Sequence, residues 1–505
     1  MLSRDAVGAG EAGVASSSRW VILTALAVGT IMGPLDSSVV NIALPQIQAA
    51  FGVDLAAVEW VSMIYLFVIS SLLLTFGRVG DLYGHRSVYL AGFTVFTAGS
   101  LLCSIAPSLP VLLVSRGIQA VGASMLMAAG PAILTEVFPP RERGQALGLN
   151  AMVVAVGLAM GPIAGGYLVD HLGWRAIFYI NLPIGLLGTA WASRVLPKVA
   201  PAAASEGGLH QRTRFDYGGA TLLAIALGAL LLAISQGQNW SWGSMPVIGL
   251  LVGGVLSLVL FVHTERQNPA SLVDLSLFRQ RLFAAANASA LLNYLTQYMV
   301  TFLMPFYLQN LLGLPPSRAG ELLIAYPLAV MLVAPLAGWL SDRIGSLYLA
   351  ATGMGVMSLA ALCLSQLNAA ATASDVLWRL SLFGIGSGLF QSPNNNAIMG
   401  SVPRPRLGQA SGMLATMRNM GMVLGIAVSG ATFSGRLAVH LRDLGVAHVA
   451  QDVAAADILR RQAFVMSLHD TFLVAAALAA FGVVTSLVRG RSLPQPGQRS
   501  RIEAR

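Results

Sequence analysis

Gly77-Arg78-Val79-Gly80-Asp81-Leu82-Tyr83-Gly84-His85-Arg86 is a charged, glycine-rich sequence that joins two long apolar stretches of the chain. A weaker copy, Gly338-Trp339-Leu340-Ser341-Asp342-Arg343-Ile344-Gly345, occupies the same setting 261 residues later. A charged hairpin that occurs twice between hydrophobic segments indicates a duplicated bundle of membrane helices. Duplicated bundles commonly move a substrate across the bilayer, so transport is the first function to consider.

The composition predicts an exterior that faces lipid. Of 505 residues, 56% are hydrophobic and 10% are charged, whereas soluble domains average about 25% charged residues. The net charge of +9 does not indicate nucleic-acid binding, because the basic residues lie in short loops between apolar spans. Cys103 and Cys363 both fall in apolar stretches, so we expect packing roles for them and neither a disulfide nor a metal site.

Fourteen stretches are long enough to cross a bilayer, which takes about 20 apolar residues in a helix. The expected spans are 20–44, 57–76, 88–105, 109–133, 145–169, 176–195, 217–235, 245–263, 283–308, 319–340, 347–366, 376–399, 409–433 and 471–488. We therefore predict an all-α membrane protein with 14 transmembrane helices.

An internal repeat predicts how these helices are grouped. Gly144-Gln145-Ala146-Leu147-Gly148 recurs as Gly408-Gln409-Ala410-Ser411-Gly412, and the offset of 264 residues spans eight segments. We expect two pseudo-symmetric six-helix bundles with two inserted central helices between them. The expected parts are a disordered cytoplasmic N-terminus (1–18), an N-terminal bundle (19–195), a cytoplasmic linker (196–216), the inserted helices (217–263), a cytoplasmic interfacial segment (264–281), a C-terminal bundle (282–488) with an outer loop (434–469), and a basic cytoplasmic tail (489–505).

The distribution of basic residues predicts the orientation in the membrane. With an even number of spans both termini lie on one side, and the segments on that side hold 21 of the 30 basic residues against seven on the other side. The side richer in Arg and Lys is the cytoplasmic side. We therefore expect a multi-pass protein of the bacterial cytoplasmic membrane with both termini in the cytoplasm.

Asp36 is the expected proton-coupling residue. It lies about 24 Å into the first span at 1.5 Å per residue, and Pro34 just before it favours a local bend. A carboxyl group there can bind a proton and release it when water or a cationic substrate arrives. Arg116 in the fourth span is the complementary charge and cannot itself carry the proton. The alternatives are a structural carboxylate and a structural ion pair. The only lysine, Lys198, is not in a phosphate-binding loop, so an ion gradient is the expected energy source.

The duplicated hairpin is expected to gate the conformational change. A carboxylate at the inner membrane surface can cap a helix or pair with an Arg of the adjacent span, and such a contact holds the inner helix ends together in an outward-open state. A plain solvated hairpin is the alternative. The expected gating residues are Gly77, Arg78, Gly80, Asp81, Gly84, Arg86, Asp342 and Arg343.

A glycine-rich face in the fifth span predicts close helix packing. Gly157, Gly161 and Gly165 are spaced four apart, and Pro162 and Gly166 lie beside them. Small residues at this spacing let helix backbones approach each other. We interpret this face as a rocking seam, with static helix packing as the alternative.

Polar residues within other spans are candidates for the wall of a substrate cavity, although each of them can instead form a helix–helix hydrogen bond. The candidates are Asn41, Tyr65, Gln119, Asn293, Tyr294, Gln297, Tyr326, Gln391, Asn394 and Asn395. Tyr298, Asn396 and Arg418 are further polar residues inside expected spans.

Five stretches resemble motifs of the major facilitator superfamily, in particular of its fourteen-span drug:proton antiporter branch. They resemble the first-helix signature (35–45), the loop between helices two and three (77–86), the fourth-helix motif (116–122), the antiporter motif of helix five (157–166) and the entry to helix six (174–185). The resemblance implies a role for Arg116 in proton transfer. His85 and Trp339 stand where a basic residue is usual in that family.

Together these observations predict a proton-coupled antiporter that exports lipophilic, cationic or zwitterionic drugs by alternating access. A narrow-specificity exporter or importer of one metabolite and a non-transporting membrane receptor are the alternatives. We expect no enzymatic activity, because no nucleophile–base pattern or metal-ligand cluster is evident, and no cofactor or metal. The expected partners are a small-molecule substrate, protons and membrane lipid, without nucleic acid, and a monomer is compatible with this architecture.

Overall fold

The computed structural model describes residues 16–139, 142–197, 217–237, 240–267, 275–403, 406–446 and 452–489, and these residues form helices and no strand. Eleven helical segments among them are long and apolar enough to cross a membrane. The helices of the first half are α1 (Ser16–Phe51), α2 (Leu55–Val58), α3 (Trp60–Tyr83), α4 (His85–Ser104), α5 (Leu109–Val137), α6 (Arg143–Leu172), α7 (Ala176–Tyr179) and α8 (Asn181–Val195). Those that follow are α9 (Tyr217–Gln236), α10 (Met245–Gln267), η2 (Leu275–Arg279), α11 (Arg281–Phe306), η3 (Tyr307–Leu311), α12 (Pro316–Leu323), α13 (Ala325–Ile344), α14 (Ser346–Ser365), α15 (Ala373–Gly400), α16 (Leu407–Asp443) and α17 (Val453–Val488).

A helix occupies each of the fourteen expected spans, but only eleven helical segments of the described residues are both long enough and apolar enough to cross a membrane by themselves. The helices α9, α11 and α15 are not among the eleven selected segments, and only a shorter apolar stretch of α9, Thr221–Gln236, is found. The helix α11 includes the amides Asn287, Asn293 and Gln297, and α15 includes Asn394 and Asn395. Polar side chains of this kind lower the apolarity of a helix that packs inside a bundle and not against lipid.

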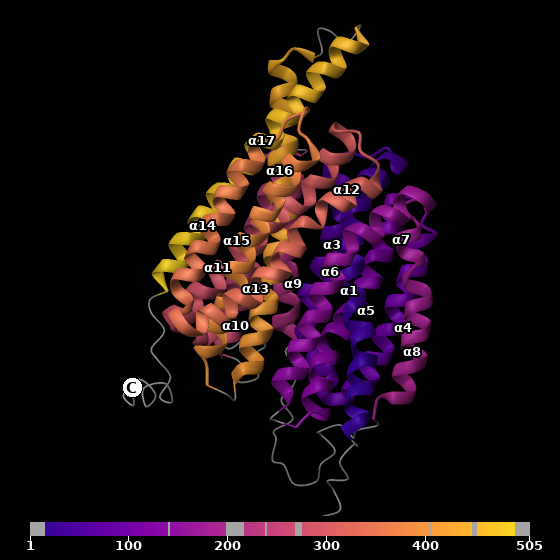
Figure 1. Ribbon diagram of the computed structural model, residues 1–505, viewed down its shortest axis with the longest axis vertical. Helices are drawn as coiled ribbons and strands as arrows, with labels where there is room; N and C mark the ends of the chain where they lie inside the picture. Colours follow the sequence, from indigo (N-terminus) through magenta and orange to yellow (C-terminus); the bar gives the residue numbers. More distant parts are fainter. Residues whose placement is uncertain are drawn as a thin grey trace, which may run out of the picture.

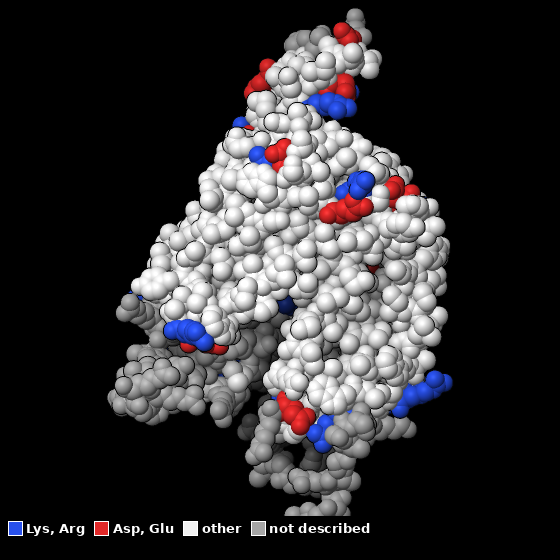
Figure 2. Space-filling view, in the orientation of Figure 1, with Lys and Arg blue, Asp and Glu red and all other residues white. Residues whose placement is uncertain are grey.

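The helices form two groups that lie side by side. In Figure 1 most of the helices α1 to α8, coloured indigo to magenta, lie on one side, and α11 and α13 to α17, coloured orange to yellow, lie on the other. The short helix α12 extends over the end of the first group and packs against α6. The helix α9 packs against α10 and contacts both α3 and α16, so it lies along the join between the groups. On the face shown in Figure 2, charged side chains gather near the two ends and leave a broad uncharged band between them, as a lipid-facing surface requires.

The same helix contact occurs once in each group. The helices α4 and α5 cross at Gly92 and Gly122, and α14 and α15 cross at Gly353 and Gly386. A Cβ atom at any of these four glycines would meet backbone atoms of the facing helix, so the glycines are what allows the close crossing. The offset of 264 residues between Gly122 and Gly386 is the offset of the sequence repeat.

The expected outer loop 434–469 is helical over most of its length. The helix α16 continues to Asp443 and α17 begins at Val453, so the two form a hairpin that extends beyond the bundle at the top of Figure 1. Arg436 and His440 of α16 contact the carboxylate of Asp470 of α17 at 2.5 and 2.8 Å. The sequence analysis placed this segment outside the membrane without assigning its secondary structure; it is helical because it is rich in alanine and has no proline.

The other expected non-membrane parts are described only in part. The interfacial segment 264–281 includes the end of α10, the short helix η2 and the start of α11. Residues 1–15, 198–216 and 490–505 lie outside the described residues, so the structure does not test the expectations for the N-terminus, the linker and the tail.

Candidate functional site

A cavity of about 1560 Å³ lies between the two groups of helices, and its wall is mostly apolar. Its lining residues come from α1, α3, α5 and α6 on one side and from α11, α13, α15 and α16 on the other. Gly77, Arg78 and Asp81 line it at the end of the bundle where the duplicated hairpin lies. Figure 2 shows the molecule hollowed between its two halves at this end, so the cavity is open on the side of the hairpin.

The opposite end of the bundle is closed by contacts between the two groups. The Ser317 hydroxyl on α12 donates a hydrogen bond to the Asp170 carboxylate on α6 at 2.5 Å. The side-chain amide of Gln309 donates to the backbone carbonyl of Ile42 on α1 at 2.8 Å, and Gln309 is buried. These contacts, together with the close crossing of α6 and α12, separate the cavity from this end of the molecule.

The crossing of α6 and α12 depends on two glycines. A Cβ atom at Gly166 would meet the backbone carbonyl of Pro316, and one at Gly320 would meet the backbone carbonyl of Pro162. Because both obstacles are backbone atoms, neither can move aside as a flexible side chain would. The closed end therefore requires small residues at these two positions.

We expect Gly320→Ala to weaken this closure. Overpacking typically costs about 1–3 kcal/mol, so a cysteine placed at Ser317 should react with a membrane-impermeant maleimide at least about fivefold faster in the Gly320→Ala background. The control is Gly355→Ala on α14, because a Cβ there meets only Val483 at 3.9 Å, an ordinary van der Waals distance. Equal labelling rates in the two backgrounds would show that Gly320 is not needed for the closure.

Asp36 and Arg116 form a buried ion pair inside the first group of helices. Their side chains are 0% and 1% exposed, and the Arg116 Nη1 atom lies 2.5 Å from Asp36 Oδ2. The other carboxylate oxygen, Oδ1, accepts hydrogen bonds from Gln119 Nε2 at 2.8 Å and from Asn181 Nδ2 at 2.9 Å. Arg116 also donates to the Gln119 side-chain oxygen at 2.6 Å and to the backbone carbonyl of Val61 at 3.1 Å. The Asp36 carboxylate and the Arg116 guanidinium thus compensate each other's charge, and neighbouring amides satisfy the second carboxylate oxygen.

Tyr65 separates this ion pair from the cavity. Neither Asp36 nor Arg116 lines the cavity, but Tyr65 does, and the centre of its ring lies 4.1 Å from the Arg116 guanidinium carbon. Ser37 and Asn41, on the same helix as Asp36, also line the cavity. Only the Tyr65 side chain therefore lies between the cavity and the ion pair, and a movement of Tyr65 would expose the ion pair to the cavity.

The first hairpin contains a compact set of polar contacts at the cavity mouth. The Asp81 carboxylate lies 3.4 Å from both Arg78 and His85, and His85 also lies 3.4 Å from Glu136 of α5. The hydrogen bond from His85, together with the charge of Arg78, lowers the pKa of Asp81, so Asp81 is ionised at neutral pH. Arg86 donates to the backbone carbonyls of Ser193 and Leu196 at 2.7 and 3.0 Å, at the end of α8.

The two hairpins share their turn but not their side-chain contacts. Gly84 and Gly345 have φ angles of +90° and +89°, a conformation that favours glycine, and each ends a helix. Gly80, one of the expected gating residues, lies within α3, where its missing side chain leaves room for the His85 ring. In the second copy the Arg343 guanidinium stacks 3.9 Å from the Trp339 ring, and no ion pair of Asp342 is found among the described residues.

The glycine-rich face of α6 contacts two different partners. Gly157, Gly161 and Gly165 pack against α1 in the same group, and a Cβ at Gly161 would meet the side chain of Ser38. Gly166 and Pro162 instead contact α12 of the other group. Only the second contact joins the two groups, so a seam between them can involve Gly166 and Pro162 but not the three glycines that face α1.

Seven of the ten candidate cavity residues line the cavity: Asn41, Tyr65, Tyr294, Gln297, Tyr326, Gln391 and Asn395. Three do not, which corrects our expectation. Gln119 belongs to the Asp36 network, the Asn293 amide contacts the sulfur atoms of Met357 and Met354 at 3.1 and 3.5 Å, and Asn394 donates to the carbonyl of Ala286 at 3.0 Å. Asn394 and Asn395 are about 100° apart around their helix, and here Asn395 lines the cavity while Asn394 contacts α11.

The sequence analysis missed or undervalued three polar residues. Arg418 was noted only as a polar residue within a span, and Asn419 was not noted, yet both line the cavity. Glu59, at the start of α3, is 0% exposed and accepts a hydrogen bond from Ser235 of α9. An acid within an apolar segment is a signal that could have identified Glu59.

The family of the chain follows from a comparison with known proteins. The family model described as Major Facilitator Superfamily matches residues 26–426. The chain belongs to the major facilitator superfamily. Members of this superfamily are multi-pass membrane transporters and not enzymes, which agrees with the eleven apolar helices and with an origin in a bacterial inner membrane.

Two curated relatives and one solved structure are similar to most of this chain. The riboflavin transporter RibZ of Clostridioides difficile (strain 630) is 33% identical over 472 residues, 93% of this chain and 97% of that protein. The multidrug resistance protein Stp of Mycobacterium tuberculosis (strain CDC 1551 / Oshkosh) is 34% identical over 422 residues, 83% of this chain and 76% of that protein. The crystal structure of a bacterial homologue of the human lysosomal transporter Spinster, in an inward-facing and unoccupied conformation, has the same fold, with a TM-score of 0.66, 17% identity and coverage of 95% of this chain and 99% of that one.

Proposed function

We propose that this chain is a proton-coupled antiporter that exports lipophilic small molecules across the bacterial cytoplasmic membrane. In this proposal all fourteen helical segments span the membrane as two bundles of six with α9 and α10 inserted, and both termini lie in the cytoplasm. The cavity then opens to the cytoplasm, where it would take up its substrate. The observation that carries the proposal is the buried Asp36–Arg116 ion pair, one side chain away from a cavity that is closed at one end only.

Proton binding at Asp36 would change the forces between α1 and α5. The carboxylate is the counter-charge of Arg116 and accepts three hydrogen bonds from Arg116, Gln119 and Asn181. Protonation removes the negative charge of the carboxyl group and converts one of its hydrogen-bond acceptors into a donor. The ion pair therefore weakens while Arg116 keeps its charge. The proton therefore favours a different arrangement of these helices, which is what coupling requires.

The helix α1 connects the proton site with the closed end of the cavity. Ile42, whose carbonyl accepts the hydrogen bond of Gln309 at the closure, lies six residues after Asp36, about 9 Å along the same helix. A shift of α1 on protonation would therefore act directly on a contact that holds the two groups together at this end. Proton binding at Asp36 and closure of the cavity would thus both act on the position of α1, and this shared helix couples them physically.

The relatives support two hypotheses about how many different substrates this transporter accepts. The relative Stp is named a multidrug resistance protein, which supports export of several lipophilic drugs. The relative RibZ is named a riboflavin transporter and matches along nearly its full length, which supports the second candidate, a narrow-specificity transporter of one heteroaromatic metabolite. Competition distinguishes them: a multidrug exporter is inhibited by several unrelated compounds, and the second candidate by riboflavin-like compounds alone.

The proposal is tested in lipid vesicles that contain the purified full-length chain. An imposed pH gradient should drive movement of a transported compound against its concentration gradient, and an uncoupler should abolish it. The panel includes fluorescein, rhodamine 6G and riboflavin, so that a narrow specificity is also detected. A flux that an uncoupler does not affect would reject proton coupling, and the absence of flux for every compound in the panel would favour a non-transporting receptor.

A further inference from the structure

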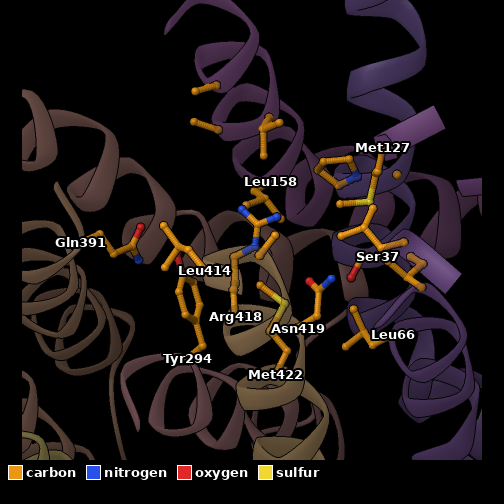
Figure 3. A pocket seen from close by; sticks show the side chains of 18 of the residues that line it. Ser37, Leu66, Met127, Leu158, Tyr294, Gln391, Leu414, Arg418, Asn419 and Met422 are labelled. Carbon is orange, nitrogen blue, oxygen red and sulfur yellow. The ribbon is translucent and has the colours of Figure 1, made fainter. Parts of the chain in front are cut away.

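Arg418 places a positive charge that has no carboxylate partner among the described residues deep in the cavity. It lies on α16, eleven residues after Leu407, which is about 16 Å along the helix from the cavity mouth. In Figure 3 its side chain extends from the second group of helices toward Leu158 of the first. The guanidinium donates a hydrogen bond to the Tyr294 hydroxyl, and no carboxylate pairs with it among the described residues.

The other charged residues of the cavity wall are compensated or lie at the mouth. They are Arg78, Asp81 and Arg143. Arg78 pairs with Asp81, and Arg143, at the start of α6, donates to the backbone carbonyl of Phe138 at 3.0 Å. No acidic residue lines the deep part of the cavity among the described residues. This arrangement does not favour the cationic substrates that the sequence analysis expected.

A guanidinium in an apolar cavity attracts an acidic ligand more strongly than it would in water. It keeps its charge at every physiological pH and can donate two parallel hydrogen bonds to a carboxylate, sulfonate or phosphate group. Asn419 and Tyr294 line the cavity near it and supply further polar groups, whereas Leu158, Met127 and Leu66 form apolar wall, as Figure 3 shows. The surroundings suit a lipophilic body that bears one acidic group.

We propose that Arg418 is an anion-binding subsite and that the substrates of this transporter are lipophilic acids or zwitterions with an acidic group. This inference rests on the proposed function and specifies the chemical class of its substrate. Arg418 would contact the acidic group, and the apolar wall would bind the rest of the molecule.

The proposal has a consequence for the driving force. Exchange of one proton for one cation moves no net charge, so such export responds to the pH gradient alone. Exchange of one inward proton for one outward monoanion moves two charges in the direction that an inside-negative membrane potential favours. Export of an acidic substrate should therefore accelerate when a potassium diffusion potential, negative on the cytoplasmic side, is added to a fixed pH gradient.

A binding experiment with two dyes tests the subsite. Fluorescein and rhodamine 6G share a xanthene ring but carry negative and positive charge, and fluorescence anisotropy measures the Kd of each for the detergent-solubilised full-length chain. We expect fluorescein to bind at least about tenfold more tightly than rhodamine 6G, and Arg418→Gln to weaken fluorescein binding at least about tenfold. Arg418→Lys should lose less, because it keeps the charge, and rhodamine 6G binding should stay unchanged or improve in both variants.

The matched control is Arg460→Gln, which removes the same charge from an exposed position on α17 and should leave both Kd values unchanged. Retained rhodamine 6G binding and unchanged helical circular dichroism show that a variant is folded. Three results would each overturn the subsite. They are equal binding of the two dyes, no fluorescein binding by the unmodified chain, and an unchanged Kd for fluorescein in Arg418→Gln.

The binding experiment separates this inference from the proposed function, because it needs no proton gradient. Proton-driven movement of rhodamine 6G without binding of fluorescein would reject the subsite and leave the antiporter proposal intact. Binding of fluorescein that depends on Arg418, without any proton-driven flux, would reject the antiporter proposal alone.

Discussion

Replacement of Asp36 by Asn is expected to reduce pH-gradient-driven transport to the level of protein-free vesicles. Asparagine is nearly the same size as aspartate and keeps one oxygen that can accept from Gln119 or Asn181, but it cannot bind and release a proton. Because the coupling proton has no other site in the proposed cycle, the gradient can no longer drive the transporter. The measurement is the initial rate of substrate accumulation under an imposed pH gradient.

The single substitution also affects stability, so a second variant is needed. Asp36→Asn leaves the buried Arg116 without its counter-charge, and removal of one partner of a buried ion pair typically costs about 3–5 kcal/mol. The double variant Asp36→Asn with Arg116→Gln removes both charges and should unfold at a higher temperature than the single variant. It should still fail to couple transport to the gradient, since it has no titratable group at this site.

Substrate exchange distinguishes a loss of coupling from a loss of transport. Exchange of labelled for unlabelled substrate across the membrane needs no net proton movement, so the folded double variant should retain it while net gradient-driven transport is absent. The control is Asp457→Asn, an exposed carboxylate of the α16–α17 hairpin that pairs with Arg461 at 2.9 Å, and it should transport at the normal rate. Gradient-driven transport at full rate in either Asp36 variant would show that Asp36 is not the coupling residue.

The features that the sequence predicted well are those that depend on local properties of the chain. A helix lies in each expected span because the length of an apolar stretch is a local property. The burial of Asp36 was predictable for a similar reason, since a charged group in the middle of such a stretch avoids lipid by facing the interior of the bundle. Gly84, which lies in the glycine-rich hairpin motif of the sequence, has the positive φ angle that a sharp reversal of the chain requires.

The features that the sequence did not predict depend on how helices rotate against partners far away in the chain. Asn181 contacts Asp36 across 145 residues, and no spacing near either residue reveals it. Asn293 and Asn394 were expected in the cavity, but the rotation of α11 and α15 turns both into helix–helix contacts. Arg418 faces the cavity for the same reason, because the phase of α16 is set by its packing against α11.

A glycine pattern likewise predicts that another helix packs closely against that face, but it does not predict which helix. The five small or kinking residues of α6 were treated as one seam, yet three of them contact α1 and only Gly166 and Pro162 contact α12. Adjacent positions such as Gly165 and Gly166 point about 100° apart around a helix. A face that is continuous in sequence can therefore make one contact within a group of helices and another between the two groups.

Cross-linking of α6 to α12 is expected to stop transport. If the two groups separate at this end during the cycle, a disulfide between Asp170→Cys and Ser317→Cys should trap the cavity in the conformation seen here. The two native side chains are in contact at 2.5 Å, so cysteines at these positions lie within reach of each other. After oxidation, gradient-driven transport should fall at least about tenfold, and a reductant should restore it.

The structure offers a matched control in which the same chemistry joins two helices of one group. The side-chain oxygens of Ser289 on α11 and Thr485 on α17 lie 2.8 Å apart, so Ser289→Cys with Thr485→Cys places two thiols within reach of each other. The disulfide between them joins helices of one group and should leave transport unchanged. The native thiols do not interfere, since Cys103 is buried and Cys363 is half-buried within apolar helices. Trapping of the α6–α12 pair should also preserve substrate binding from the open side while it prevents release on the other. Full transport with the α6–α12 disulfide in place would mean that this end of the bundle does not open during the cycle, and alternating access would have to be discarded for this chain.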